Sequence, residues 1–190
     1  MKNTIKSIFA VTLVLAAFAF TNPITKKVDV KESSIEWMGK KVVGNSHSGT
    51  LTLKSGYIEM EGTNMTGGEF VVDMTSINVT DPAEGKGKDR LEGHLKSEDF
   101  FGVEAHPEAT LVIKSATKDG SNNIVVADLT IKGITEEVTF NLGKEGNTVT
   151  TRLVFDRSKF NVRYGSGSFF DDLGDKAISD DITLDVMLKF

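Results

Sequence analysis

Apolar residues recur at every second position over many short segments, and this period of two limits most strongly what the chain can fold into. It is the period of a β-strand with one buried face and one solvated face. The C-terminal segment shows it most clearly, with Ile182, Leu184, Val186, Leu188 and Phe190 alternating with Thr183, Asp185, Met187 and Lys189. The same alternation occurs in Leu51/Leu53, Phe70/Val72/Met74, Ile124/Val126, Val138/Phe140/Leu142 and Val149/Thr151/Leu153/Phe155. The chain is therefore predicted to be mostly antiparallel β.

Turn-forming residues separate these segments. Residues 118–123 read Lys-Asp-Gly-Ser-Asn-Asn and residues 143–147 read Gly-Lys-Glu-Gly-Asn, both rich in residues that tolerate positive φ. Eight or so short strands at this spacing are typical of a β-sandwich or a closed up-and-down barrel. A chain of 190 residues without an internal repeat or linker is most simply one domain.

One stretch, between residues 81 and 107, departs from the strand pattern. Leu91, His94 and Leu95 fall on one helical face by their i, i+3, i+4 spacing, which predicts a short helix over Asp89–Lys96. Gly102 and Pro107 end the irregular region before the next strand. In an all-β protein such a helical segment commonly covers an open end of the sheet, so we expect a lid or mouth here.

The first 21 residues are predicted to be a secretory signal peptide. Lys2 and Lys6 precede an apolar run from Ile8 to Phe20, and Ala17-Phe18-Ala19 has the small-x-small pattern of a cleavage site. The run is shorter than the roughly 20 residues that a membrane-spanning helix needs. We therefore expect residues 1–21 to be removed, residues 22–190 to form the single domain, and the protein to be periplasmic or secreted.

Composition excludes several classes of function. With 27 acidic and 22 basic residues the net charge is -5, which argues against a nucleic-acid-binding surface. The chain has no cysteine, so it has no disulfide, thiolate nucleophile or Cys-ligated metal. Its three histidines lack metal-ligand spacing, and no G-x-S-x-G or P-loop motif occurs. We therefore predict no catalytic residue, no metal site and no enzymatic activity.

Two longer motifs point to a family. Residues 94–103 read His-Leu-Lys-Ser-Glu-Asp-Phe-Phe-Gly-Val, with Pro-Glu-Ala-Thr at 107–110, and residues 129–139 read Leu-Thr-Ile-Lys-Gly-Ile-Thr-Glu-Glu-Val-Thr. Both resemble motifs of the YceI-like polyisoprenoid-binding family, in the same order. The resemblance implies an extended, lipocalin-like barrel of eight antiparallel strands with a long hydrophobic pore. It also implies an exported protein that binds a long-chain isoprenoid. In the Arg-x-x-Phe/Tyr-Gly segment of the family, Asn161 stands in place of the glycine.

The candidate site residues follow from this implied pore. Those proposed to line the pore or its mouth are Trp37, Phe70, Leu91, His94, Phe100, Phe101, Phe155 and Phe160. Arg90 and Arg157 are the candidates for holding a diphosphate or quinone head group, with a solvated surface position as the alternative for each. The expected partner is an isoprenoid, a quinone-like lipid or another amphipathic lipid, with no cofactor besides it. A homodimer and transient membrane contact are further expectations.

Three alternatives stay open at this point. The C-terminal alternation ending in Phe190 also fits the last strand of an outer-membrane barrel. A hydrolase could be drawn from His47 beside Ser48, or from His94 near Glu98. A calcium site could be drawn from the acidic residues between Asp171 and Asp181.

Overall fold

The computed structural model of the protein describes residues 23–81, 87–120 and 122–190. The predicted signal peptide, residues 1–21, lies outside the described residues. The strands are β1 (Ile24–Lys27), β2 (Asp29–Lys40), β3 (Ser46–Glu61), β4 (Asn64–Val79), β5 (Glu108–Asp119), β6 (Asn122–Ile131), β7 (Ile134–Glu145), β8 (Thr148–Asp156) and β9 (Asp181–Lys189). The helices are α1 (Lys88–Lys96) and two 3₁₀ turns, η1 (Arg157–Phe160) and η2 (Gly174–Lys176). Among these described residues, no helix has the length and apolar character to cross a membrane.

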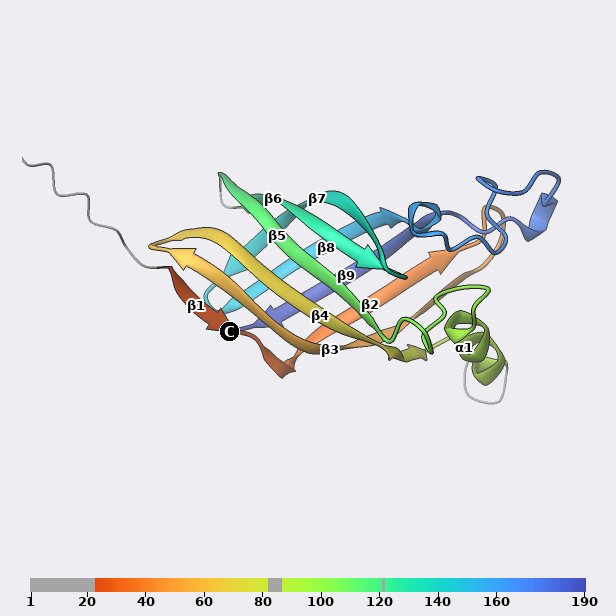
Figure 1. The fold of residues 1–190 in the computed structure, drawn as a ribbon, viewed down its shortest axis with the longest axis horizontal. Coiled ribbons are helices and arrows are strands. Elements are labelled where there is room, and N and C mark those ends of the chain that lie inside the picture. Colours follow the sequence, from red (N-terminus) through yellow and green to blue (C-terminus); the bar gives the residue numbers. More distant parts are fainter. Residues whose placement is uncertain (1–22, 82–86, 121) are drawn as a thin grey trace, which may run out of the picture.

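The strands close into an eight-stranded antiparallel barrel, as predicted. Their order is β3-β2-β9-β8-β7-β6-β5-β4, and β4 pairs again with β3 to complete the ring (Figure 1). The short strand β1 adds to β3 beyond the point where β2 pairs with it. Closure leaves the ladder of the barrel without a free edge, which removes a site of aggregation.

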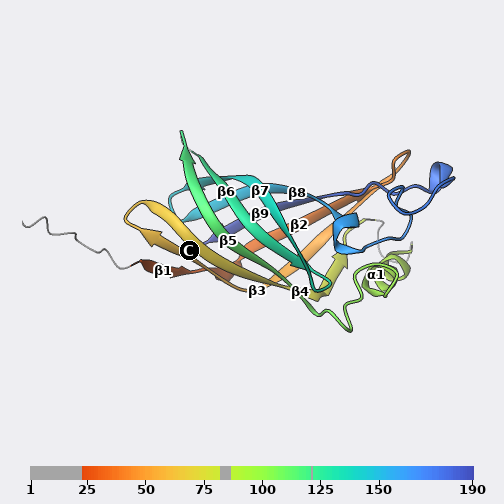
Figure 2. The ribbon, with the colours of Figure 1, turned by 45° about the horizontal axis from the view of Figure 1, so that its top comes forward.

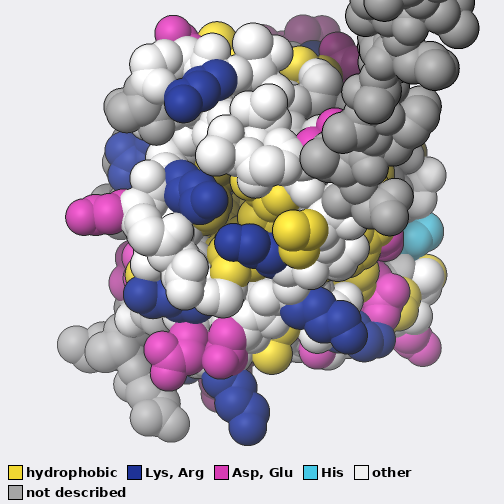
Figure 3. All heavy atoms as spheres, turned by 90° about the vertical axis from the view of Figure 1, so that its left-hand side faces the viewer, with side chains coloured by type: hydrophobic (Ala, Val, Ile, Leu, Met, Phe, Trp, Pro, Cys, Tyr) yellow, Lys and Arg dark blue, Asp and Glu magenta, His cyan; other side chains and the backbone are white. Residues whose placement is uncertain are grey.

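The two ends of the barrel differ in construction (Figures 1 and 2). At one end, here called the hairpin end, lie β1, the C-terminus and the turns β3–β4, β5–β6 and β7–β8. The other end, here called the helical end, carries α1, η2, the β2–β3 turn and the long β8–β9 connection. Figure 3 looks onto the hairpin end, where hydrophobic side chains lie at the centre and side chains of both charges surround them.

Most of the predicted alternation faces the interior as expected. The alternating residues of β9 and β8, for example, point into the barrel. The prediction for Ile124/Val126 was wrong by one residue, because Val125 is 0% exposed and Ile124 is 38% exposed. Val125 pairs with the inward-facing Phe140 of β7, and this pairing decides which face of β6 is buried.

Candidate functional site

The interior of the barrel holds a cavity of about 320 Å³. Its walls are almost wholly apolar and come from every strand of the ring. Representative wall residues on five strands are Leu53, Phe70, Leu129, Leu153, Ile182, Leu184 and Val186. A cavity of this size lies at the lower end of the range for small-molecule sites, and its chemistry suits a hydrocarbon ligand.

The cavity opens at the helical end. Three of its lining residues, Lys40, Lys41 and Asn45, are exposed, and all three belong to the β2–β3 turn or the strand end beside it. Leu91 of α1 and Ile178 of the β8–β9 connection also line the cavity. The opening is therefore bounded by the turn, the helix and the β8–β9 connection.

Beneath the β3–β4 turn the interior is filled by side chains. Ile58 is 1% exposed, and Met60 and Met65 are also buried there. These residues belong to the hydrophobic core of the barrel but are not among the residues that line the cavity. The cavity nevertheless reaches the hairpin end along β8 and β9, where the paired residues Val149 and Leu188 line it.

The helical segment supplies part of the cavity wall, as predicted. Leu91 and Leu95 on one face of α1 line the cavity, together with Phe100 and Phe101 from the segment that follows. Ser97 is the C-cap residue of α1, and its hydroxyl (2.7 Å) and backbone N–H (3.1 Å) both donate to the His94 carbonyl. The helix is thus a packed cover whose apolar face completes the cavity.

The β6–β7 turn holds the Phe100–Phe101 segment in place. Lys132 adopts a left-handed conformation (φ 52°) at this turn. Its ammonium donates to the carbonyl oxygens of Phe100 (2.9 Å) and Glu98 (3.2 Å). These contacts satisfy backbone groups that would otherwise lie unpaired at the end of the barrel. The two motifs quoted from the sequence therefore meet in space.

Trp37 lies on the opposite wall of the cavity, where a glycine makes room for it. Gly49 of β3 is its direct cross-strand partner. A Cβ atom at Gly49 would lie 2.6 Å from the Trp37 ring and 1.9 Å from the carbonyl oxygen of Asn78. Both distances are too short for any side chain. The absence of a side chain at Gly49 therefore positions the indole ring.

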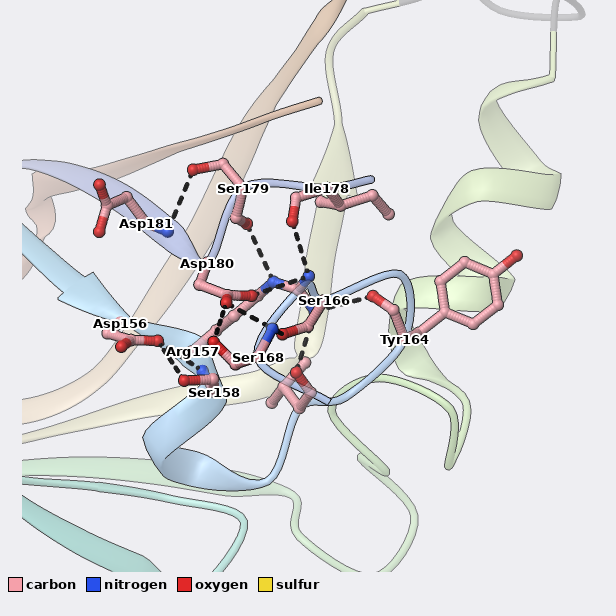
Figure 4. A network of polar contacts seen from close by, with 11 residues as sticks. Asp156, Arg157, Ser158, Tyr164, Ser166, Ser168, Ile178, Ser179, Asp180 and Asp181 are labelled. Carbon is pink, nitrogen blue, oxygen red and sulfur yellow. Dashed lines mark hydrogen bonds and ion pairs between the residues drawn. The ribbon is translucent and has the colours of Figure 1, made fainter. Parts of the chain in front are cut away.

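Arg157 anchors the β8–β9 connection from inside the protein (Figure 4). Its side chain is 0% exposed. Nε donates to the Ser179 carbonyl (3.0 Å), Nη1 to the carbonyls of Val162 and Tyr164 (both 2.9 Å), and Nη2 to the Ile178 carbonyl (3.2 Å) while lying 3.2 Å from Asp180 Oδ1. Four of the five N–H groups of the guanidinium thus donate hydrogen bonds to loop carbonyls, and the contact with Asp180 Oδ1 is an ion pair. The guanidinium therefore binds the β8–β9 connection, and this buried position does not fit the predicted contact of Arg157 with a lipid head group.

Asp180 extends this network on its other side. Its Oδ2 accepts hydrogen bonds from the hydroxyls of Ser166 (2.9 Å) and Ser168 (2.7 Å). Burial lowers the pKa of Arg157 from its ordinary value, and the negative charges of Asp180 and Asp156 oppose that shift. The guanidinium remains charged at any physiological pH. The network therefore fixes the β8–β9 connection above the barrel.

Asn161 ends η1 in a left-handed conformation (φ 57°). Its backbone N–H bonds back to the carbonyls of Arg157 and Ser158. Glycine and asparagine are the residues that adopt this conformation at the least cost. Asparagine can therefore stand at a position where the family pattern has glycine without a change in the backbone.

The structure brings six of the ten predicted site residues to the cavity wall. These are Trp37, Phe70, Leu91, Phe100, Phe101 and Phe155. The other four, Arg90, His94, Arg157 and Phe160, are not among its lining residues. Arg90 is exposed on α1, and Phe160 lies behind the wall with its ring edge against Phe155 (centroids 5.7 Å apart).

His94 joins the helix to the β8–β9 connection. Its ring packs edge-on against Phe100 (centroids 5.1 Å apart) and Tyr164 (4.4 Å). Its Nε2 lies 3.8 Å from a carboxylate oxygen of Asp99. His94 therefore holds two covering segments together at the helical end.

Sequence reasoning missed the polar residues at the opening, Lys40, Lys41, Asn45 and His47. The sequence marks this segment only as a turn between two alternating segments. A turn alone does not show that its residues border a cavity. His47 and Ser48 contact Asp81 rather than each other: Nδ1 of His47 lies 3.3 Å from the Asp81 carbonyl, and the Ser48 hydroxyl donates to the Asp81 carboxylate (3.2 Å). Within the described ranges, no group of three or more His, Asp or Glu residues is placed to hold a metal ion.

Comparison with known proteins agrees with this architecture. The chain is similar to a UPF0312 protein of Staphylococcus aureus (38% identical over 87 residues, 40% of this chain and 48% of that protein). It is also similar to one of Staphylococcus epidermidis (40% over 79 residues, 39% and 43%). The chain thus spans about half the length of these curated relatives.

Two solved structures share the fold. One is BcnA of Burkholderia cenocepacia (TM-score 0.64, 22% identical, covering 85% of this chain and 98% of that one). The other is a polyisoprenoid binding domain from Saccharophagus degradans implicated in plant cell wall breakdown (TM-score 0.59, 16% identical, 85% and 95%). The sequence model of the YceI-like domain matches residues 27–190, which is nearly the whole described barrel. This chain belongs to the YceI-like family.

Proposed function

We propose that this protein is an exported carrier that holds a long-chain isoprenoid or a quinone-like lipid in its barrel. The observation that carries the proposal is the almost wholly apolar cavity that opens at one end. Burial of each CH₂ group contributes about 0.8 kcal/mol, so a chain of several isoprene units binds tightly without polar recognition. The polyisoprenoid binding domain among the structural neighbours supports the same ligand class.

In this proposal the tail of the lipid lies along the cavity and its head group lies at the opening. Polar groups of the lining gather there, at Lys40, Lys41, Asn45 and His47, while the rest of the wall is hydrocarbon apart from Thr110 and Thr151. A diphosphate or quinone head in this position keeps its contact with water. The ammonium groups of Lys40 and Lys41 take the head-group role for which Arg90 and Arg157 were candidates.

The role is binding without chemistry of its own. The cavity wall offers hydrocarbon surfaces, and His47 and His94 make contacts that orient loops. The outer-membrane alternative is disfavoured because Ile182 and Leu184 line the interior, while Asp185 pairs with Arg152 on the outside of the barrel (2.7 and 2.8 Å). A lipid-embedded barrel has its apolar side chains on the outer face.

Export is part of the proposal and rests on residues 1–21. Transfer of a lipid also implies transient contact with a membrane. N-terminal sequencing of the protein from the exported fraction is expected to begin near residue 20 to 22. An intact N-terminus on protein retained inside the cell would contradict this part.

The single tryptophan of the chain provides a direct binding assay, because Trp37 lies in the cavity wall. A quinone that enters the cavity is expected to quench Trp37 emission saturably. Replacing Phe100 and Phe101 by aspartate should abolish the quenching, because each charge would face hydrocarbon. Val112→Asp, on the exposed side of β5, is the matched control and should leave it unchanged. Equal quenching of the wild type and the double aspartate variant would overturn the assignment.

A further inference from the structure

Several large apolar side chains are exposed at the helical end. Val42 (66% exposed) and Val43 lie in the β2–β3 turn, and Tyr164, Phe169 and Phe170 (47%) lie in the β8–β9 connection. We call these five residues the rim surface. Other exposed apolar residues, such as Val112 and Ile124, stand singly on the strands of the barrel wall and need no special explanation.

Hydrogen bonds join the two segments that carry the rim surface. The Val42 N–H donates to the Ala177 carbonyl (2.9 Å), and the Ser179 N–H donates to the Lys40 carbonyl (2.9 Å). Figures 1 and 2 both show the turn and the connection side by side at this end. Arg157 and Asp180 hold the connection from beneath. The exposed apolar groups are therefore presented by a fixed framework.

The aromatic part of the rim surface is amphipathic. The Arg163 guanidinium lies 4.5 Å from the centre of the Phe169 ring and 6.0 Å from that of Phe170. Aromatic rings beside a cation suit the boundary between lipid head groups and acyl chains. The exposed charges nearby nearly balance, with Lys40, Lys41, Arg163 and Lys176 against Asp171, Asp172 and Asp175. Attraction to a membrane here would therefore be mainly apolar and only weakly dependent on salt.

We propose that the rim surface docks on the surface of a lipid bilayer, so that the cavity opens toward the membrane. This inference rests on the proposed function, because it names the membrane as the source and destination of the ligand. The rim surface and the cavity opening share the β2–β3 turn, with Val42 and Val43 next to Lys40 and Lys41. A lipid tail that passes between bilayer and cavity at this place avoids exposure to bulk water.

Flotation with phosphatidylcholine vesicles tests the proposal. The wild-type protein is expected to float with the vesicles, and to do so nearly equally at low and high salt. Val42→Asp/Val43→Asp and Phe169→Ser/Phe170→Ser should each lower the fraction bound by about tenfold or more, since the inserted apolar area is lost. The matched control Val112→Asp/Ile124→Asp, which changes exposed apolar residues of the wall, should bind as the wild type does.

Trp37 quenching by a short-chain quinone in the same variants separates this inference from the proposed function. Normal quenching with lost flotation in both rim variants supports docking. A wild type that is quenched but does not float overturns docking alone, whereas one that floats without quenching overturns the carrier role alone. Equal loss of flotation in the control also contradicts docking. If the wild type sediments as a dimer that the rim variants dissociate, the surface belongs to a second copy and docking is overturned.

Discussion

The hairpin end and the helical end of the barrel are covered in different ways. At the hairpin end, packed apolar side chains fill the space beneath the β3–β4 turn, where Ile58 is 1% exposed. The helical end is covered by irregular segments that polar contacts hold in place, above all those of the buried Arg157. Packing fills space, whereas a framework of hydrogen bonds can cover an end and leave a cavity beneath it. The difference places the opening of the cavity at the helical end.

The largest expected effect comes from breaking the framework of the helical end. Arg157→Met removes the guanidinium but leaves Asp180 and four loop carbonyls without their partner. Breaking one partner of a buried pair costs about 3 to 5 kcal/mol in the free energy of unfolding. Urea denaturation measures this loss. Arg152→Met, which removes an exposed pair on the outer wall, is the control and should cost far less. Equal losses would contradict an anchoring role for Arg157.

The second prediction tests whether packing fills the space beneath the β3–β4 turn. Ile58→Ala should lower the free energy of unfolding by about 2 to 5 kcal/mol, because it leaves a cavity in a filled core. The change should leave quinone quenching of Trp37 intact. Leu184→Ala in the cavity wall should do the reverse, with a smaller loss of stability and weaker quenching. If Ile58→Ala weakens ligand binding more than Leu184→Ala does, the ligand space extends beneath the β3–β4 turn.

A smaller effect is expected at the backbone of the helical end. Asn161→Val places a β-branched residue at a left-handed position (φ 57°) and should cost about 1 to 2 kcal/mol of stability. Asn161→Gly should be nearly neutral or slightly stabilising, since glycine adopts this conformation freely. Thermal denaturation of the two variants checks the order. A valine variant as stable as the glycine variant would show that the turn relaxes.

The smallest effect concerns the outer wall between the two ends, where Asp73 points away from the cavity. The hydroxyl and backbone N–H of Thr75 donate to its carboxylate (2.6 and 2.9 Å) and lower its pKa below the ordinary value of 3.8. The native state therefore binds fewer protons than the unfolded state in acid. This stabilisation is present above the unfolded pKa and is lost as the pH falls through the native value. In a plot of the free energy of unfolding against pH, Asp73→Asn should make the fall at acidic pH less steep. Thr75→Ala should have the same effect. An unchanged fall at acidic pH in both variants would contradict the stabilising role of the Asp73 carboxylate.

Much of the fold could be predicted from the sequence, because the alternation of β8 and β9 reports directly which face is buried. The buried face of β6 could not be predicted, since Ile124 and Val125 are both apolar and only pairing with β7 decides which of them points inward. The helix over Leu91 and Leu95 was predictable for the same reason as the strands, because the spacing of its apolar residues reports which face is buried.

The candidate site was only partly predictable. Aromatic residues such as Phe100 and Phe101 were found through their motif, and they line the cavity. Arg157, expected at the opening, is buried, whereas Lys41, which was not a candidate, lies at the opening, because a sequence shows where charges occur but not whether the fold buries them. Arg157 is enclosed by a loop that returns from residues 178–180, and this contact across the chain has no local signal.

The most direct test of the account is organic extraction and mass spectrometry of the protein, purified without detergent from the exported fraction of its native host. We expect an isoprenoid or a quinone in near-stoichiometric amount, and we expect the Phe100→Asp/Phe101→Asp variant to lose it. Folded wild-type protein that carries no such lipid, and whose Trp37 emission no quinone quenches, would contradict the central claim that the cavity is a lipid site.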